Sequence, residues 1–296
     1  MRVFLTGATG FIGSAIVKEL IAAGHQVAGL SRSKEKAEAL SAAGATVVQG
    51  TVEDFDLLKR SAGEADGVIH TAFNHDFSRF AQNCEDDRKV IEVLGAALAG
   101  SDRPLVVTSG TAIANIAPGQ VAEEDSPAMT SDMMPRAASE EAAASAARQG
   151  TNVSVVRLPQ VHDPRRQGLI SPAIEMARES GAFAYVGDGG NRWPAAHVLD
   201  VAALYRLALE RATPDAIYNA VAEEGVAMRD IADVVGKRLG LRVESIAPEE
   251  AEARLGWLAR FATHDMPASS RKTREWLGWN PKGPDLLSDL ARLDLS

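Results

Sequence analysis

A glycine-rich turn near the start of the chain constrains the fold more than any other feature. Gly7, Gly10 and Gly13 recur at intervals of three in "LTGATGFIGS", between an apolar run that predicts a strand and residues that predict a helix. In such a unit the glycines permit a tight turn, close approach to a pyrophosphate and close helix packing. The helix N-terminus adds free N–H groups and about half a positive charge. The motif predicts a phosphate-binding turn, although a turn that binds nothing is the alternative; its residues are Gly7, Thr9, Gly10, Phe11 and Ile12.

Strands and helices alternate through the first half of the chain. Short aliphatic runs that predict strands occupy residues 2–5, 26–30, 46–49, 67–72, 104–109 and 153–158. The segments between them predict helices, and most of these end at a glycine. Continuous apolar strands separated by helices are typical of a parallel sheet that is covered on both faces. We therefore predict an α/β fold with a doubly wound parallel sheet of the Rossmann type.

The alternation stops after residue 163. A loop, a helix near 170–180 and the glycine cluster of "YVGDGGNRWP" follow, and then come further helices and two short strands. We predict that residues 1–163 form a dinucleotide-binding domain and that residues 195–222 return to it. Residues 164–194 and 223–296 are then expected to form a smaller C-terminal substrate lobe.

Composition excludes several functional classes. The 31 basic and 40 acidic residues give a net charge of −9 without a long basic run, which argues against a nucleic-acid or anionic-membrane surface. The single cysteine, Cys84, rules out an internal disulfide and a cysteine-rich zinc site, and the dispersed histidines predict no metal site. No apolar stretch reaches the roughly 20 residues that span a bilayer, and the N-terminus lacks a signal-peptide core. We expect a soluble, cytoplasmic protein with a small-molecule substrate and neither nucleic-acid nor membrane partners.

The glycine motif also carries a family resemblance. With "GFIG" it resembles the extended short-chain dehydrogenase/reductase superfamily, in its epimerase/dehydratase-like branch. The segments "GVIHTA", "LVVTSGTA" and "VSVVRLPQVHDP" resemble the family's fourth, fifth and sixth strands, and "HVLDVAALYRLALE" resembles the helix that returns to the nucleotide domain. The resemblance implies a nicotinamide dinucleotide bound across the carboxyl ends of the strands. By similarity, the residues that line the cofactor after the third, fourth and sixth strands are Thr51, Val52, Thr71, Ala72, Phe73 and Pro159 to Val161.

The end of the second strand indicates which dinucleotide is bound. Sites that prefer NAD usually place Asp or Glu there, to accept hydrogen bonds from the ribose hydroxyls. This chain has "GLSRS" instead, so that Ser31 and Arg32 offer a hydroxyl and a fixed cation where a 2′-phosphate would lie. We therefore predict NADP(H) in preference to NAD(H). Alternatively, Arg32 is a solvated loop residue or stacks on adenine without selecting a cofactor.

The catalytic pattern of the family is missing. The resemblance implies a Tyr-x-x-x-Lys pair on the fifth helix, in which the tyrosine moves the proton and the lysine lowers its pKa. Alignment of "PRAASEEAAAS" through Ser139 places Arg136 at the tyrosine position and Glu140 at the lysine position. These two side chains share a helix face, so they form either a surface ion pair or a site in which Arg136 faces a ligand.

Other residues must then orient the substrate and move the proton. Ser109 and Thr111 lie just past a strand end, where either hydroxyl could bind a substrate oxygen, and we favour Thr111 slightly. Tyr185 beside the glycine cluster and His75 after the fourth strand are candidate proton donors. The structural alternatives are a turn capped by its own hydroxyls, a packed aromatic ring and a loop histidine.

The remaining candidates are less specific. Asn191, Arg192 and Trp193 lie at the expected junction of the lobes, where they line a cleft or are buried in the interface. The helix expected over 79–100 resembles one that pairs subunits, so a homodimer is possible. We predict an NADP(H)-dependent oxidoreductase that transfers a hydride to or from a carbonyl, alcohol or imine with a non-standard proton donor. The alternatives are a non-catalytic NADP(H) sensor and a nucleotide-sugar epimerase or dehydratase.

Overall fold

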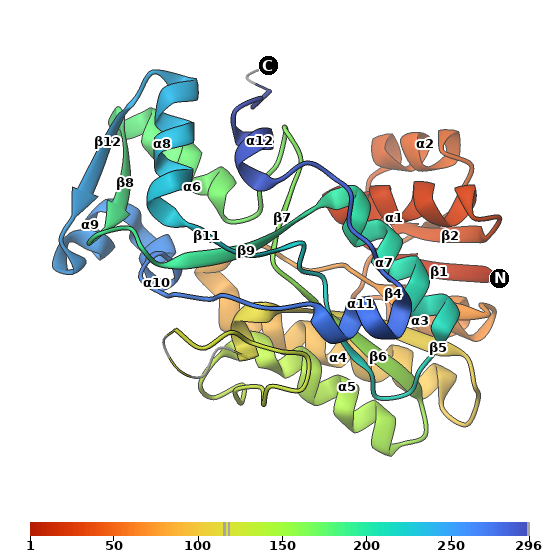
Figure 1. Ribbon diagram of the computed structural model, residues 1–296. Coiled ribbons are helices and arrows are strands. Elements are labelled where there is room, and N and C mark those ends of the chain that lie inside the picture. The colour runs from red at the N-terminus through yellow and green to blue at the C-terminus, as the bar shows by residue number, and fades with distance from the viewer. Residues whose placement is uncertain (115–116, 118, 295–296) are drawn as a thin grey trace.

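A seven-stranded parallel sheet lies at the centre of the protein (Figure 1). The computed structural model describes residues 1–114, 117 and 119–294. The strands lie in the order β10-β6-β5-β4-β1-β2-β3, and every neighbouring pair is parallel. Their bounds are β1 (Arg2–Thr6), β2 (Gln26–Ser31), β3 (Thr46–Gln49), β4 (Gly67–His70), β5 (Pro104–Gly110), β6 (Asn152–Leu158) and β10 (Ile217–Asn219).

Helices cover both faces of this sheet, because successive side chains of a strand point to opposite sides. Val3 and Leu5 of β1 belong to a buried cluster with α1, α2 and α7, whereas Phe4 belongs to a second cluster with α3, α4 and α5. The predicted doubly wound parallel sheet of the Rossmann type is therefore confirmed. The helices are α1 (Phe11–Ala22), α2 (Lys34–Ala42), α3 (Phe55–Gly63), α4 (Phe80–Leu98), α5 (Ala138–Arg148) and α7 (Val198–Arg211).

Helix α7 and strand β10 bring a late part of the chain back to the sheet. Helix α7 packs along α1, and Arg206 Nε donates to Glu19 Oε1 at 2.7 Å. Strand β10 then pairs with β6, with Ile217 opposite Val155. It therefore forms one edge of the sheet, next to β6. Helix α11 (Arg271–Leu277) also packs against α7 and β10.

A smaller lobe lies beyond the carboxyl ends of the strands (Figure 1). It contains a three-stranded sheet of order β11-β9-β7, a parallel β8–β12 pair and a buried cluster of its own around Trp193, Phe183 and Ile231. Its elements are β7 (Gln160–His162), α6 (Ile170–Ser180), β8 (Ala182–Val186), β9 (Arg192–His197), β11 (Glu223–Ala227), α8 (Met228–Leu239), β12 (Arg242–Ile246), α9 (Ala251–Leu255), α10 (Ala259–Ala262) and α12 (Leu286–Leu290).

None of the helices in the described ranges is both long enough and apolar enough to cross a bilayer.

Candidate functional site

The turn between β1 and α1 has room only for glycine at two of its three glycine positions. Gly7 has a φ of +71°, and a Cβ atom on it would lie 2.7 Å from the backbone nitrogen of Ala72. A Cβ atom on Gly13 would lie 2.0 Å from the carbonyl oxygen of Gly7. Because both obstacles are backbone atoms, the turn and the close approach of α1 depend on these glycines.

The N-terminus of α1 is left open at this turn. Its N-cap is Gly10, which offers no side-chain cap, and among the described residues the first turn of the helix holds no acid. Thr9, Phe11 and Ile12 are half-buried around it. The first N–H groups of a helix need an acceptor from outside the helix. An anion fits this position by charge and by hydrogen-bonding capacity.

The end of β4 closes the other side of the turn. Thr71 Oγ1 donates to the carbonyl oxygen of Thr6 at 2.8 Å, and the Ala72 backbone nitrogen donates to Thr6 Oγ1 at 3.4 Å. Thr71 and Ala72 stay partly exposed, as do Val52 after β3 and Pro159 between β6 and β7. Thr51 is exposed, and its hydroxyl accepts from the Glu53 backbone. The structure therefore brings Thr71 and Ala72 to the glycine turn.

The end of β2 presents one unpaired cation. Arg32 is exposed, and no hydrogen bond or ion pair joins it to the described residues. Ser31 is buried, and its hydroxyl donates to the carbonyl oxygen of Ser33 at 2.9 Å. Ser33 in turn caps α2, accepting from Lys36. Of the two residues proposed for a 2′-phosphate, Arg32 is therefore the one whose donors are available.

Ser109, near the carboxyl end of β5, and Thr111, directly after this strand, differ in the partners of their hydroxyl groups. Both residues are only 3% exposed. Thr111 Oγ1 donates to the carbonyl oxygen of Leu158 at 3.4 Å, which ties it to the end of β6. Ser109 Oγ is buried, and no described atom is its partner. The available hydroxyl is that of Ser109, whereas the sequence slightly favoured Thr111.

A buried network of polar groups lies between the ends of β1, β4 and β5 and the start of α5. Asp87 of α4 is its centre, because its carboxylate oxygens lie 2.9 Å from His70 Nε2, 3.0 Å from Arg136 Nη1 and 2.5 Å from Ser139 Oγ. His70 Nδ1 lies 2.7 Å from Thr6 Oγ1. Arg136 Nη1 also donates to Ser139 Oγ, and Nη2 donates to the Thr108 carbonyl oxygen at 2.9 Å.

The charges in this network are held internally. Burial by itself raises the pKa of the Asp87 carboxyl, but the Arg136 cation, His70 and the Ser139 hydroxyl outweigh it and lower that pKa to about 2. The Arg136 side chain is 16% exposed, so it forms a largely buried ion pair with Asp87. Of the two alternatives for Arg136, the surface ion pair with Glu140 is not formed.

Glu140 forms a second ion pair with another arginine. Arg157 of β6, whose side chain is 1% exposed, donates to the two Glu140 carboxylate oxygens at 2.8 and 2.9 Å. Its Nη1 also donates to the Glu124 carbonyl oxygen at 3.4 Å. Arg136 thus pairs with Asp87 and Glu140 pairs with Arg157, so Arg136 and Glu140 do not pair with each other.

His75 lies among aromatic rings next to this network. The Arg136 guanidinium covers the Phe73 ring at 4.4 Å, and the ring centroids of Phe73 and His75 are 5.4 Å apart. Desolvation among these groups and the Arg136 cation lower the pKa of His75. His75 is therefore neutral at pH 7, with one ring nitrogen able to donate and the other able to accept.

Other candidates lie elsewhere. Tyr185 is on β8 at the outer end of the small lobe, packed in that lobe's own cluster, so the structure does not bring it to Ser109 (Figure 1). Trp193 is 1% exposed, and Arg192 forms an ion pair with Asp265 at 2.8 Å, so this segment is structural. Asn191 donates to the Ala262 carbonyl oxygen.

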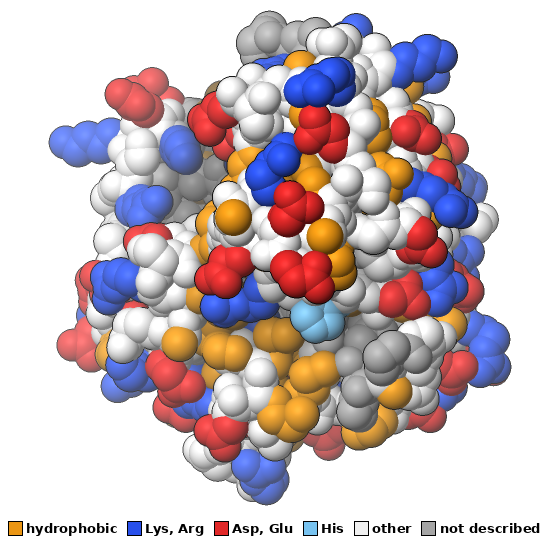
Figure 2. Space-filling model, turned by 90° about the vertical axis from the view of Figure 1, so that its left-hand side faces the viewer, with side chains coloured by type: hydrophobic (Ala, Val, Ile, Leu, Met, Phe, Trp, Pro, Cys, Tyr) orange, Lys and Arg blue, Asp and Glu red, His pale blue; other side chains and the backbone are white. Residues whose placement is uncertain are grey.

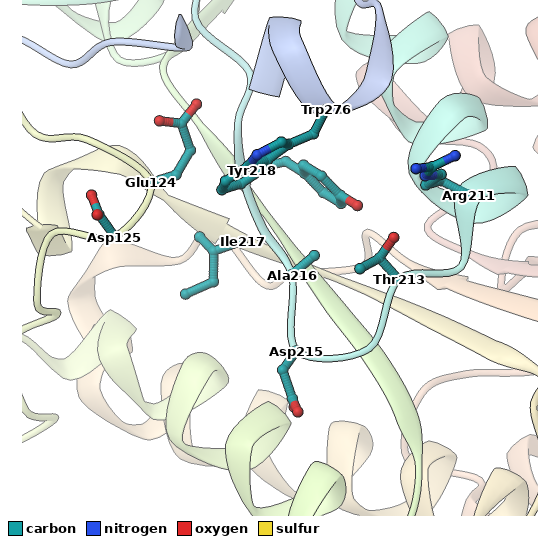
Figure 3. Close-up of a pocket in the computed structure, with 9 residues that line it drawn as sticks. All are labelled: Glu124, Asp125, Arg211, Thr213, Asp215, Ala216, Ile217, Tyr218 and Trp276. Atoms are coloured by element: carbon teal, nitrogen blue, oxygen red, sulfur yellow. The ribbon is translucent and has the colours of Figure 1, made fainter. Parts of the chain in front are cut away.

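A pocket of about 480 Å³ opens beside edge strand β10 (Figure 3). Residues of the loop that enters β10 line it, so it lies at the amino end of that strand, away from the glycine turn. Trp276 of α11, which is 46% exposed, forms one wall. This pocket holds none of the residues that the sequence singled out for catalysis or cofactor binding.

Asp87 is not among the residues that the sequence motifs singled out, although the sequence carries a signal for it. Asn83, Cys84, Asp87, Val90 and Ile91 recur at helical spacing and are all buried on one side of α4. An acid on an apolar helix face needs a buried partner, because an unpaired charge is costly there. The pattern could have identified Asp87 but not its partners.

Comparisons with known proteins identify the family and agree with the fold. The model of the NAD dependent epimerase/dehydratase family matches residues 3–227. An uncharacterized protein of Schizosaccharomyces pombe is 46% identical over 292 residues, which are 98% of this chain and 98% of that protein. The dTDP-glucose 4,6-dehydratase of Streptomyces venezuelae with NAD bound has a TM-score of 0.79 at 22% identity, over 99% of this chain and 95% of that chain. For the UDP-glucose 4-epimerase of Thermus thermophilus in complex with NAD, the TM-score is 0.75 at 23% identity, over 98% and 97%.

Proposed function

The chain belongs to the NAD-dependent epimerase/dehydratase family, and from that premise we propose that it is an NADP(H)-dependent oxidoreductase acting on a carbonyl, alcohol or imine of a small molecule. The main support for a bound dinucleotide is the turn between β1 and α1. This turn leaves no room for a Cβ atom at Gly7 or Gly13, and it leads into a helix N-terminus without a side-chain cap. This turn fits a pyrophosphate. The residues that would hold the rest of the dinucleotide are Thr9, Phe11, Ile12, Arg32, Thr51, Val52, Thr71, Ala72 and Pro159.

Arg32 supports the preference for NADP(H). Its side chain is exposed and unpaired among the described residues at the end of β2, and this strand end carries no carboxylate to repel a phosphate. We expect Arg32→Ala to weaken NADPH binding about 10- to 100-fold, the equivalent of one lost charged hydrogen bond, and to leave NADH binding unchanged. Titration calorimetry with both nucleotides measures this. Arg60→Ala, on the exposed last turn of α3, is the control, and equal losses for NADPH and NADH would contradict the assignment.

The residues after β4 and at the end of β5 would supply the groups that handle the substrate. A nicotinamide dinucleotide, when bound, would supply or accept the hydride. The Ser109 hydroxyl is buried and has no partner among the described atoms, so it is the group to which we assign the substrate oxygen. Neutral His75 can accept the proton of an alcohol or, through its remaining N–H, polarise a carbonyl. Arg136 and Glu140 stand at the positions of the family's tyrosine and lysine, and their ion pairs support a structural role for both.

Ser109 can be tested against Thr111. We expect Ser109→Ala to lower kcat about 100-fold, as loss of a single oxyanion donor does elsewhere, with little change in thermal stability because no protein partner is lost. Thr111→Val is the matched control and should lower kcat less than Ser109→Ala. The measurement is NADPH oxidation with a responsive carbonyl substrate, together with a thermal melt. A larger kcat loss in Thr111→Val would assign the role to Thr111 instead.

A nucleotide-sugar epimerase or dehydratase is the second candidate, favoured by the fold shared with a dehydratase and an epimerase. One assay separates the two. A reductase oxidises NADPH in proportion to product when it is given a panel of aldehydes, ketones and imines. An epimerase or dehydratase converts a nucleotide sugar without net change in the cofactor. A protein that binds NADPH and is silent in both assays would instead be a sensor.

A further inference from the structure

A row of aromatic rings runs from the candidate site to the small lobe. We call Phe73, His75, Phe77, Phe80 and Trp257 the ring row. Within it, the His75 and Phe77 centroids are 6.3 Å apart, and those of Phe77 and Phe80 are 5.6 Å apart. Phe77 stacks on Trp257 with centroids 4.0 Å apart and an angle of 8° between the planes.

The ring row begins at the site where the hydride transfer is proposed. Phe73 directly follows Thr71 and Ala72, which contact the glycine turn, and it lies under Arg136. Arg136 is bonded to the carbonyl oxygen of Thr108, the neighbour of Ser109. At its other end the row reaches Trp257, which packs against the buried cluster of the small lobe and lies 6.3 Å from the Phe261 ring. The row therefore connects the two lobes at the edge that carries Ser109.

The ring row remains partly open to solvent. The four hydrophobic members are half-buried and His75 is exposed. The face of the molecule in Figure 2 carries a gathering of hydrophobic side chains below a belt of charged ones. In Figure 1 the segment that leads into α4 lies directly below α10 on that side. Partly exposed aromatic side chains beside a candidate site are suited to ligand contact, and aromatic rings pair with other rings by offset stacking or by edge-to-face contact.

The position of His75 limits the shape of the ligand. Its ring lies between those of Phe73 and Phe77, so a flat group on the row is next to the group that handles the proton. The reacting carbonyl must then be attached to the flat group or lie one or two bonds from it. A nucleotide sugar does not meet this condition, because a diphosphate separates its base from its sugar.

We propose that the substrate is an aromatic or conjugated carbonyl compound whose flat part stacks on the ring row and whose oxygen faces Ser109 and His75. This inference rests on the proposed function. In the reduction, the carbonyl carbon gains the hydride from the reduced nucleotide and the oxygen gains a proton from solvent water. The products are the alcohol, the oxidised nucleotide and hydroxide, which the buffer neutralises. Trp257 is the residue that determines the preference for flat substrates, because it is stacked on Phe77. A bound ring must either insert between Trp257 and Phe77 or stack on the outer face of one of them.

Benzaldehyde and cyclohexanecarbaldehyde test this proposal, because they have similar size but only the first is flat. We expect the intact protein to have a lower KM for benzaldehyde in NADPH oxidation. Trp257→Ala should raise the KM for benzaldehyde about 10-fold, the typical loss of one stacking partner, with kcat nearly unchanged. The KM for cyclohexanecarbaldehyde should change less than about twofold. Trp257→Phe keeps a ring and should restore most of the difference.

Trp276→Ala is the matched control, because this tryptophan is exposed beside β10, away from the ring row. A thermal melt with NADPH checks that each variant folds and binds the nucleotide. Equal KM changes for the two aldehydes in Trp257→Ala, binding of neither aldehyde by the protein–NADP⁺ complex in saturation-transfer NMR, or conversion of UDP-glucose would overturn the substrate class. Absence of any NADPH-dependent shift in the intact protein would overturn the proposed function itself, and the substrate class with it.

Discussion

Asp87→Ala is expected to lower the free energy of unfolding by about 3–5 kcal/mol, the usual loss when one member of a buried ion pair is removed. Asp87 is 6% exposed and is the common partner of His70, Arg136 and Ser139. Without it, the Arg136 guanidinium remains largely buried over the Phe73 ring with its charge uncompensated. Urea denaturation followed by circular dichroism measures the change.

The neighbouring acid provides the control for Asp87. Asp86 pairs with Lys89 at 3.2 Å, but both side chains are about half exposed, at 53% and 54%. Exposed ion pairs contribute less than about 1 kcal/mol, so Asp86→Ala should leave the unfolding free energy nearly unchanged. Similar values for the two variants would mean that the Asp87 network contributes little to stability.

Acid titration gives an independent measure of the same group. The pKa of Asp87 is lowered from its ordinary value of 3.8 to about 2 in the folded protein, which corresponds to about 2 kcal/mol. Because the folded pKa is the lower one, this stabilisation is present above pH 4 and is lost as the pH falls from about 4 towards 2. The loss of stability of the intact protein over that range should be correspondingly smaller in Asp87→Ala.

Glu140→Lys is expected to destabilise the protein by at least about 3–5 kcal/mol, although it introduces the lysine that the sequence resemblance implies at this position. The lysine would place an ammonium group against Arg157, whose side chain is 1% exposed and would lose both of its hydrogen bonds to Glu140. Thermal and urea denaturation measure the effect. A stable Glu140→Lys variant would contradict the structural role that we give to this ion pair.

Two further variants keep the test of Glu140 specific. Ala144→Lys adds a lysine to an exposed position of the same helix and should change stability by less than about 0.5 kcal/mol. Combining Glu140→Lys with Arg157→Glu reverses the pair and should recover part of the loss, because the coupling between the two positions is restored. No recovery in the double variant would indicate that the charges do not interact.

The sequence predicted the parts of the protein that local pattern determines. The glycine spacing located the turn before α1, and the alternation of apolar runs and helices predicted the parallel sheet, because both depend on short-range backbone geometry. The ends of β2 and β5 were predicted to within one residue. These ends placed Ser31, Arg32, Ser109 and Thr111 among the candidates.

The contacts that define the site depend instead on positions far apart in the chain. Arg136 and Asp87 are 49 residues apart in the sequence. Residue spacing predicts contacts within one helix, but it does not predict that the start of α5 lies against the middle of α4. The stack of Phe77 on Trp257 joins the two lobes and has no local signal. Only the structure shows the hydrogen-bond partners that distinguish Ser109 from Thr111. Likewise, only the structure shows that Tyr185 lies on β8, in the small lobe.

The packing of α7 on α1 makes the glycine turn dependent on the second half of the chain. Glu19 of α1 accepts a hydrogen bond from Arg206, which lies 187 residues later in the chain. During synthesis on the ribosome, the part of the apolar side of α1 that packs on α7 has no cover until α7 has emerged. A nascent chain halted before that helix holds every residue of the turn but lacks its support, and it is the kind of intermediate that chaperones retain. Cofactor affinity would therefore arise late in translation, and a truncation that removes α7 would abolish it without altering a single contact residue.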